Sequence, residues 1–149
     1  MKIALACDHG GYPLKKVVKD CILADGYTVI DLGTDSARSV DYPDYAEKLG
    51  LSIIHGEADR GILICGSGVG ASIAANKIKG IYAGVCHDTY SAHQGVEHDN
   101  MNVLCLGARV IGDELAIELV DAFLKATFSN QARHVRRLNK IYKIEKAGI

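Results

Sequence analysis

Short apolar runs alternate with helical patterns along this chain of 149 residues, and the alternation limits the folds it can adopt more than any other feature. Five runs are short and rich in aliphatic or β-branched residues, as strands are, and each is followed by a turn and a helical pattern. Strands that alternate with helices in this way pair in parallel and are covered by helices on both faces. We therefore predict a single α/β domain over residues 1–149, a Rossmann-like three-layer sandwich around a five-stranded parallel sheet. The strands are predicted at Lys2–Cys7, Tyr27–Leu32, Ile62–Cys65, Ile81–Cys86 and Asn102–Leu106.

The chain ends in a helical pattern at about residues 131–147, which we predict to be an extension beyond the sandwich. This tail has six basic residues and one acid, Glu145, whereas the rest of the chain is acidic in balance. A basic tail on an acidic body is expected to meet an anion, either a small phosphate or the surface of a partner, or else to be a solvated helix face. The other helices are predicted at Leu14–Ala24, from Tyr42 to about His55, from Ala71, from Asp88 to about Glu97, and at Asp113–Ala126.

Composition excludes several classes of partner. The formal net charge is −1, so no overall field attracts nucleic acid or a membrane surface. No apolar run approaches the roughly 20 residues that span a bilayer, and the N-terminus leads directly into a strand rather than a signal peptide. The five cysteines have no paired spacing, which is typical of reduced thiols in a compartment such as the cytoplasm. We expect a cytoplasmic protein with no nucleic-acid or membrane partner.

The stretch Gly61–Gly80 places a glycine-rich turn between a buried strand and a helix. Backbone N–H groups point out of such a turn, and the helix N-terminus adds partial positive charge. Cys65 is the last residue of the strand and lies beside this positive end, which favours its thiolate form. The stretch therefore predicts a cradle for a phosphate or an oxyanion with a candidate base or nucleophile next to it.

Two other interpretations of this stretch stay open from the residues alone. Cys65 is equally well explained as a small buried hydrophobic residue, the commonest role of a free cysteine. The spacing of Gly66, Gly68 and Ala71, with Asp88 about 20 residues further on, also fits a dinucleotide-binding fingerprint. Against a dinucleotide site, two strand–helix units precede the glycines, whereas the fingerprint normally opens its domain.

Ligands of open parallel sheets bind outside the carboxyl ends of the strands. The residues that directly follow the predicted strands should therefore meet at one edge of the sheet. They include an acid, two histidines, a thiol and an arginine, which is more chemistry than a structural edge needs. These residues are Asp8 and His9, Gly33 and Thr34, Cys65 to Gly70, His87 and Asp88, and Gly107 to Arg109.

Six short motifs, in order and with matching spacing, resemble the ribose-5-phosphate isomerases of the B type. The resemblance covers nearly the whole chain, and the wider family includes galactose-6-phosphate isomerase subunits. It implies interconversion of ribose 5-phosphate and ribulose 5-phosphate, a step of the pentose phosphate pathway, by a homodimer that needs no cofactor. The acids and histidines show no metal-ligand spacing such as His-Glu-x-x-His, so no metal is expected either. The motifs are Asp8–Gly11, Val40–Tyr45, Ile64–Gly70, Glu97–Val103, Gly107–Arg109 and Arg133–His134.

The resemblance also implies roles for individual residues. Cys65 would be the base that moves the proton through a cis-enediolate, with Ser67 assisting, and His98 would open the furanose ring. Such an isomerisation needs a base near C1 and C2, donors for the oxyanion and a clamp for the phosphate. The expected oxyanion donors are the N–H groups of Gly66, Gly68 and Gly70. The expected sugar contacts are Asp8 and Tyr42, and the expected phosphate-side residues are His9, Arg109, Arg133 and Arg137, with His134 nearby.

The sequence departs from the family pattern at two places. Asp99 follows the histidine where many members have Asn, and an ionised carboxylate cannot donate to an enediolate. Asp99 is therefore expected to be protonated or to orient His98, unless Asn100 takes the donor role. Gln131 and Ala132 precede the arginine–histidine pair where two glycines are common.

Alternatives to the leading prediction remain at this stage. The substrate could be a six-carbon sugar phosphate such as allose 6-phosphate or galactose 6-phosphate. The chain could be a non-catalytic sugar-phosphate-binding subunit, although loss of Cys65 or His98 would have favoured that, and both are present. The resemblance also implies that the tail helix crosses to the partner of a homodimer, or of a dimer of such dimers, and completes the partner's site.

Overall fold

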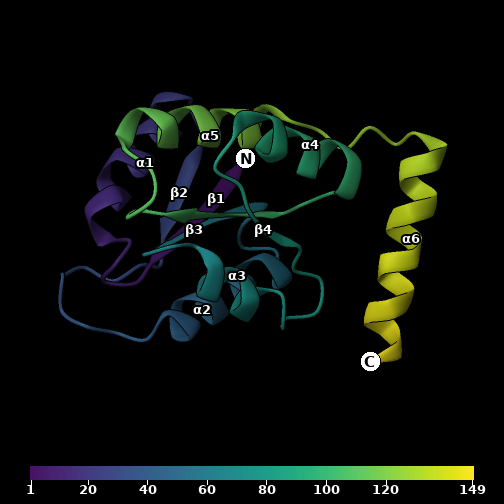
Figure 1. The fold of residues 1–149 in the computed structure, drawn as a ribbon, viewed down its shortest axis with the longest axis horizontal. Coiled ribbons are helices and arrows are strands. Elements are labelled where there is room, and N and C mark those ends of the chain that lie inside the picture. Colours follow the sequence, from purple (N-terminus) through teal and green to yellow (C-terminus); the bar gives the residue numbers. More distant parts are fainter.

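The computed structural model describes residues 1–149 as a parallel sheet between two layers of helices (Figure 1). All neighbouring strands are parallel, and their order across the sheet is β2-β1-β3-β5-β4. The predicted α/β sandwich around five parallel strands is confirmed. The strands are β1 (Lys2–Cys7), β2 (Thr28–Asp31), β3 (Arg60–Cys65), β4 (Ala83–Val85) and β5 (Val103–Gly107).

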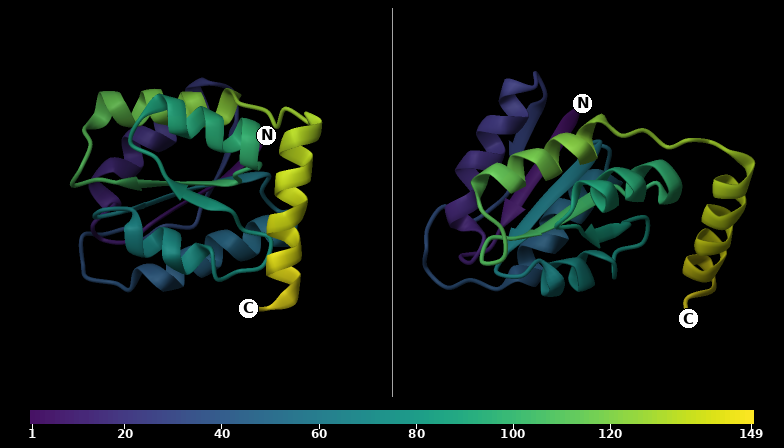
Figure 2. Two further views of the ribbon diagram at one scale, coloured as in Figure 1. Left: turned by 45° about the vertical axis from the view of Figure 1, so that its right-hand side comes forward. Right: turned by 45° about the horizontal axis from the view of Figure 1, so that its top comes forward.

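Helices cover both faces of the sheet. One layer contains α1, α4 and α5, and the other contains α2 and α3, as the two views of Figure 2 show. This division follows from the right-handed crossover that joins parallel strands, because the helix changes face when the direction of strand order reverses. The helices are α1 (Tyr12–Ala24), α2 (Tyr42–Ile54), α3 (Val69–Ala75), α4 (Thr89–Asp99), α5 (Asp113–Lys125) and α6 (Ala132–Ala147).

The three central strands are buried on both faces, which explains why their sequences are continuously apolar rather than alternating. In β3, Ile62 and Ile64 pack in the cluster under α1, α4 and α5, whereas Leu63 and Cys65 pack in the cluster under α2 and α3. A slip of one residue would exchange these faces. The register of β3 therefore fixes on which side of the sheet the Cys65 thiol lies.

Element boundaries differ from the predictions by one or two residues, for local reasons. The predicted second strand began at Tyr27, but Gly26 adopts a left-handed φ of 81° and the N–H of Tyr27 donates to the carbonyl of Ile22 at 3.2 Å. This is the hydrogen bond of a helix end, so Tyr27 belongs to the turn that caps α1 and does not start β2. The fourth strand is shorter than predicted because β4 lies at the sheet edge, and Ile81 is held in a turn by the carbonyl of Ile78.

Helix α6 confirms the predicted C-terminal extension and stands outside the three layers (Figure 2). Near its C-terminus, the Glu145 carboxylate accepts hydrogen bonds from the N–H of Gly80 at 2.7 Å and from the Tyr82 hydroxyl at 3.0 Å. The rings of Tyr82 and Tyr142 lie 5.6 Å apart, and Ile144 on the same helix is exposed. α6 is thus attached to its own chain along one side, with apolar surface left uncovered. None of the helices is both apolar and long enough to span a membrane.

Arg60, the first residue of β3, holds the end of α5 from which the connection to α6 departs. Its guanidinium donates to the carbonyl of Phe123 at 2.7 Å and to that of Ala126 at 2.9 Å, and it lies 5.5 Å from the centre of the Phe123 ring. Carbonyls at a helix C-terminus have no partners inside the helix. Arg60 supplies those partners, and burial lowers the pKa of this guanidinium.

Replacing Arg60 by methionine should lower the free energy of unfolding by about 2 kcal/mol, because hydrogen bonds from a charged donor are lost and carbonyls are left unpaired. Urea denaturation with linear extrapolation measures this loss. Arg38→Met is the matched control, because Arg38 is exposed and its side chain has no hydrogen bond, so its change should stay under about 0.5 kcal/mol. Equal losses in the two variants would contradict the capping role of Arg60.

Candidate active site

Cys65 ends β3, and the turn behind it closes tightly over its sulfur. The N–H of Gly68 donates to Sγ at 2.9 Å, and Gly68 has a left-handed φ of 83°. Residues with a Cβ rarely adopt such a φ, so glycine is required at this position. Cys65 is only 6% exposed, and its sulfur accepts this backbone hydrogen bond.

A pocket of about 340 Å³ opens beside this sulfur at the carboxyl edge of the sheet. Its volume suits a small polar metabolite rather than a dinucleotide. The structure thus brings together, in one place, predicted site residues from the ends of β1, β3 and β5 and from the starts of α2 and α3. The pocket is lined by Asp8, Tyr42, Cys65, Gly66, Ser67, Gly70, Arg109 and Val110.

Asp8 follows β1 and is 7% exposed. Its Oδ1 accepts a hydrogen bond from the N–H of Gly11 at 3.0 Å, which fixes the carboxylate at the start of α1. A Cβ on Gly11 would lie 2.1 Å from the carbonyl oxygen of Ile64, so the turn after β1 touches the backbone of β3. This contact places Asp8 directly beside the Cys65 turn.

Two further glycines let side chains approach the pocket floor. A Cβ on Gly70 would lie 2.8 Å from Cζ of Tyr42, so the tyrosine ring rests on the backbone of α3. A Cβ on Gly66 would lie 3.4 Å from Nη1 of Arg109, so the guanidinium lies over the turn. The phenol and the guanidinium therefore both line this small pocket.

His9 does not line the pocket. Its Nδ1 accepts a hydrogen bond from the N–H of Val40 at 3.2 Å and so holds the end of the connection between β2 and α2. Since Nδ1 accepts, the neutral ring carries its proton on Nε2. His87 follows the fourth predicted strand, and the structure gives it a contact at the end of the sheet. Its Nε2 accepts from the N–H of Gly107 at 3.0 Å, which joins the ends of β4 and β5 beside the pocket.

The other predicted site residues lie at the opposite edge of the sheet. α4 starts at the carboxyl edge and runs back, so His98, Asp99 and Asn100 come just before β5 begins, whereas Cys65 pairs with Gly107 at its end. β5 has five residues and therefore separates the two edges by about 13 Å. Within one chain, His98, Asp99 and Asn100 therefore do not come close to Cys65. His98, Asp99, Asn100, Arg133, His134 and Arg137 are all absent from the lining of the Cys65 pocket.

At this amino edge, His98 and His134 stack with ring centres 4.0 Å apart and planes 27° apart. His134 is 1% exposed, and its two ring nitrogens are paired with Ser129 Oγ at 2.5 Å and with Nε of Arg133 at 3.2 Å. Burial lowers the pKa of His134, and the nearby His98, Arg133 and Arg137 lower it further. His134, predicted near the phosphate, therefore offers no free nitrogen to a substrate, while Arg133 and Arg137 are exposed.

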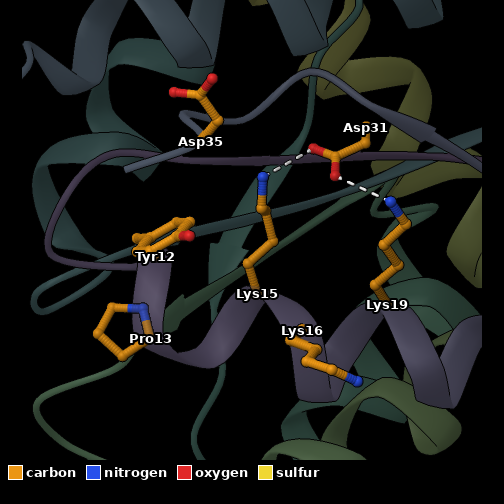
Figure 3. A pocket seen from close by; sticks show the side chains of 7 residues that line it. All are labelled: Tyr12, Pro13, Lys15, Lys16, Lys19, Asp31 and Asp35. Carbon is orange, nitrogen blue, oxygen red and sulfur yellow. Dashed lines mark hydrogen bonds and ion pairs between the residues drawn. The ribbon is translucent and has the colours of Figure 1, made fainter. Parts of the chain in front are cut away.

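A separate pocket beside α1 is lined by charges that pair with one another (Figure 3). Lys15 donates to the carbonyl of Thr34 at 2.7 Å and to Asp31 at 3.3 Å, and Lys19 donates to the other oxygen of Asp31 at 3.2 Å. Burial raises the pKa of Asp31, but hydrogen bonds from Lys19, Gly33 and Lys15 outweigh this and hold the pKa below its ordinary value. These three charged side chains anchor the chain after β2, so Lys15, Lys19 and Asp31 are occupied in the fold.

No group of three or more His, Cys, Asp or Glu side chains is arranged to hold a metal ion. Asp88, the acid of the alternative dinucleotide fingerprint, caps α4 by accepting from the N–H of Ser91 at 2.7 Å. That hydrogen bond from the Ser91 backbone lowers the pKa of Asp88, and the Ser91 side chain lowers it further. The Asp88 carboxylate is therefore occupied in capping α4.

Comparison with known proteins places this geometry in a family. Residues 3–141 match the family model described as Ribose/Galactose Isomerase. Ribose-5-phosphate isomerase B of Escherichia coli is 48% identical over 145 residues, which are 97% of each chain. D-Erythrulose-4-phosphate isomerase of Pectobacterium atrosepticum is 44% identical over 129 residues, 86% of this chain and 85% of that one.

Solved structures agree with the sequence comparison. Ribose-5-phosphate isomerase B of Clostridium thermocellum superposes with a TM-score of 0.96 at 50% identity, over 100% of both chains. The Mycoplasma genitalium ribose-5-phosphate isomerase B with bound ribulose-5-phosphate superposes with a TM-score of 0.91 at 41% identity, over 97% of this chain and 96% of that one. From the match along nearly its whole length, the chain belongs to the ribose/galactose isomerase family.

Proposed function

We propose that this protein interconverts D-ribose 5-phosphate and D-ribulose 5-phosphate through a cis-enediolate, without a cofactor or a metal. The observation that carries the proposal is the Cys65 sulfur, fixed by the N–H of Gly68 on the floor of a pocket with Asp8, Ser67 and Arg109. The relatives named for ribose 5-phosphate and the one solved with ribulose-5-phosphate bound support this substrate. Five unpaired cysteines suit a reducing compartment such as the cytoplasm.

Cys65 acts as the base in this scheme. Its thiolate takes the proton from C2 of the open-chain aldose, and the electron pair of that bond moves through C1 to the carbonyl oxygen. The N–H groups of Gly66 and Gly70 stabilise the oxyanion that develops, whereas the N–H of Gly68, expected from the sequence to be a third donor, is already bound to the Cys65 sulfur. Ser67 carries the hydroxyl proton between the two oxygens, and the thiol returns its proton to C1, which completes the ketose. Asp8 and Tyr42 hold the sugar hydroxyls.

Two required groups are missing from this pocket within one chain, namely a hydrogen-bond donor to the ring oxygen, which helps the furanose ring to open, and the clamp for the phosphate. We assign them to the amino edge of the partner in a homodimer, where His98 would donate to the ring oxygen and Arg133 and Arg137 would bind phosphate together with Arg109 and His9. An isologous dimer makes two such sites equivalent. In support, the exposed apolar residues Tyr42 and Val110 line the pocket, and α6 has exposed isoleucines.

The relatives named for ribose 5-phosphate do not favour a six-carbon sugar phosphate, the alternative considered from the sequence. The four-carbon sugar in the name of a 44% identical relative indicates that chain length varies among close relatives. Asp99 and Asn100 are exposed at the end of α4 beside His98, where the partner's substrate would lie. They are the residues that we expect to tune chain length.

Cys65→Ala should lower turnover of ribose 5-phosphate by about 10²–10⁴-fold, the usual contribution of a general acid–base group. The affinity for ribose 5-phosphate, measured by isothermal titration calorimetry, should change little because the phosphate clamp is elsewhere. Cys21→Ala is the matched control, since its thiol lies on α1, outside the pocket. Unchanged turnover in Cys65→Ala would show that Cys65 is only a buried residue of the core.

The shared site predicts complementation between two inactive variants. After subunits of Cys65→Ala and Arg137→Ala are exchanged at random, about half of the dimers are mixed, and each mixed dimer has one intact site. About a quarter of wild-type activity should therefore return. Cys65→Ala mixed with Asp8→Ala is the control and should recover nothing, because both changes damage a pocket built by one chain. Failure of the first pair after verified exchange would reject the shared site.

Asp99→Asn should keep turnover within about threefold of wild type, because an exposed carboxylate acts on its surroundings mainly through solvent. The expected changes are a shift of the pH–rate profile and a changed ratio of activities on ribose 5-phosphate and allose 6-phosphate. An inactive Asp99→Asn enzyme would instead show that the carboxylate itself takes part in the reaction.

A further inference from the structure

His98 has a hydrogen-bond partner that decides which of its ring nitrogens carries the proton. Gln94 lies one helical turn earlier on α4, and its amide Nε2 is 2.9 Å from Nδ1 of His98. An amide nitrogen can only donate, so Nδ1 must be the acceptor. The neutral His98 ring therefore carries its proton on Nε2, and Nε2 is the only ring nitrogen left free.

His134 supports the other side of this ring. It is buried, its centre is 4.0 Å from that of His98, and its own protonation is also determined by its neighbours. The guanidinium of Arg133 can only donate, so the His134 Nε2, 3.2 Å away, accepts. Its proton is then on Nδ1 and is donated to Ser129 Oγ at 2.5 Å. A neutral ring is thus stacked against His98.

We propose that Gln94 and His134 are positioning residues that present His98 as a fixed ring whose single free N–H, at Nε2, is directed to the ring oxygen of a cyclic sugar phosphate. The proposal rests on the proposed function and deepens it. Rotation of the imidazole by 180° would place a carbon opposite the Gln94 amide and lose that hydrogen bond. The stacked His134 restricts tilting of the ring without adding a second positive charge beside Arg133 and Arg137.

This arrangement predicts a selective effect on cyclic substrates. Ribose 5-phosphate closes into a furanose, which must open before its C2 proton can be removed. A tetrose 4-phosphate cannot close into a furanose, because its O4 carries the phosphate. Damage to the His98 support should therefore slow the pentose and spare D-erythrose 4-phosphate, the substrate chemistry indicated by a relative named for erythrulose 4-phosphate.

The tautomer can be measured without any activity. In protein labelled with ¹⁵N in histidine, the neutral His98 ring should show its proton on Nε2. In Gln94→Glu the proton of the neutral ring should move to Nδ1, because a carboxylate can only accept. A wild-type ring protonated on Nδ1, or the same tautomer in both proteins, would overturn the proposal.

Kinetics test the consequence. Gln94→Leu should lower kcat/KM for ribose 5-phosphate by about tenfold, a part of the 10²–10⁴-fold that an acid–base group contributes. Its kcat/KM for D-erythrose 4-phosphate should change by less than about twofold, because no ring has to open. The matched control is His93→Leu on the same helix, which removes a contact with Glu97 at 3.2 Å and should alter neither substrate.

For His134, the stacking role predicts that His134→Phe keeps the ratio of pentose to tetrose activity while His134→Ala lowers it. Equal losses on both sugars, or no loss in Gln94→Leu, would overturn the positioning role. If the wild-type protein isomerises neither sugar, the proposed function fails instead, and the tautomer measurement still decides whether Gln94 controls His98.

Discussion

A helix that joins two parallel strands must carry the chain back from the carboxyl edge of the sheet to its amino edge. The functional arrangement of this protein depends on that constraint. α4 starts beside the Cys65 pocket and ends with His98 at the other edge, one strand length away. α6 is attached at the same amino edge through Glu145 and through the His98–His134 stack. The chain therefore separates the base from the groups that we assign to ring opening and phosphate binding.

The two sets of residues are built in different ways. The Cys65 pocket depends on close backbone contact, since side chains at Gly11, Gly70 or Gly107 would collide with Ile64, Tyr42 or the backbone of Ser67. Such a site is rigid because its walls are the sheet and the turns that end it. The amino-edge set consists of longer side chains whose orientations are fixed by hydrogen bonds and stacking. The proposed reaction benefits from both, because the reacting atoms need a fixed floor and the neutral ring that donates a hydrogen bond to the sugar needs one defined tautomer.

The protonation state of His134 affects the other charged and aromatic groups at the amino edge of the sheet. Burial lowers the pKa of His134, and the neighbouring Arg133 and Arg137 lower it further, so this ring is neutral where an imidazolium would repel the two arginines. Arg133 has two uses, since its Nε holds His134 while its exposed guanidinium remains available to a phosphate. The anchoring of α5 by Arg60 fixes the start of the connection that carries these residues. The segment at the end of α5 that Arg60 stabilises is therefore also the segment that leads to the α6 residues of the site.

Much of the fold followed from local patterns. The continuous apolar runs predicted buried parallel strands, and the glycines around Cys65 predicted the turn at the end of β3, because strand burial and positive φ are properties of short segments. The same local logic placed Asp8, Ser67 and Arg109 at one edge. It erred by one or two residues at Tyr27 and in β4, where a helix end and an edge position altered the boundary.

By itself, the sequence determined the alternation of strands and helices, the position of the Cys65 turn and the basic character of the tail. Only the tertiary structure decided that His98 and Cys65 lie at opposite edges, that His134 is buried with both nitrogens occupied, and that Gln94 fixes the tautomer of His98. The physical reason is that the first set of features, those read from the sequence, depends on neighbours along the chain. The second depends on which surfaces meet after helices cross the sheet, and on which of two ring nitrogens a donor from another turn or helix reaches.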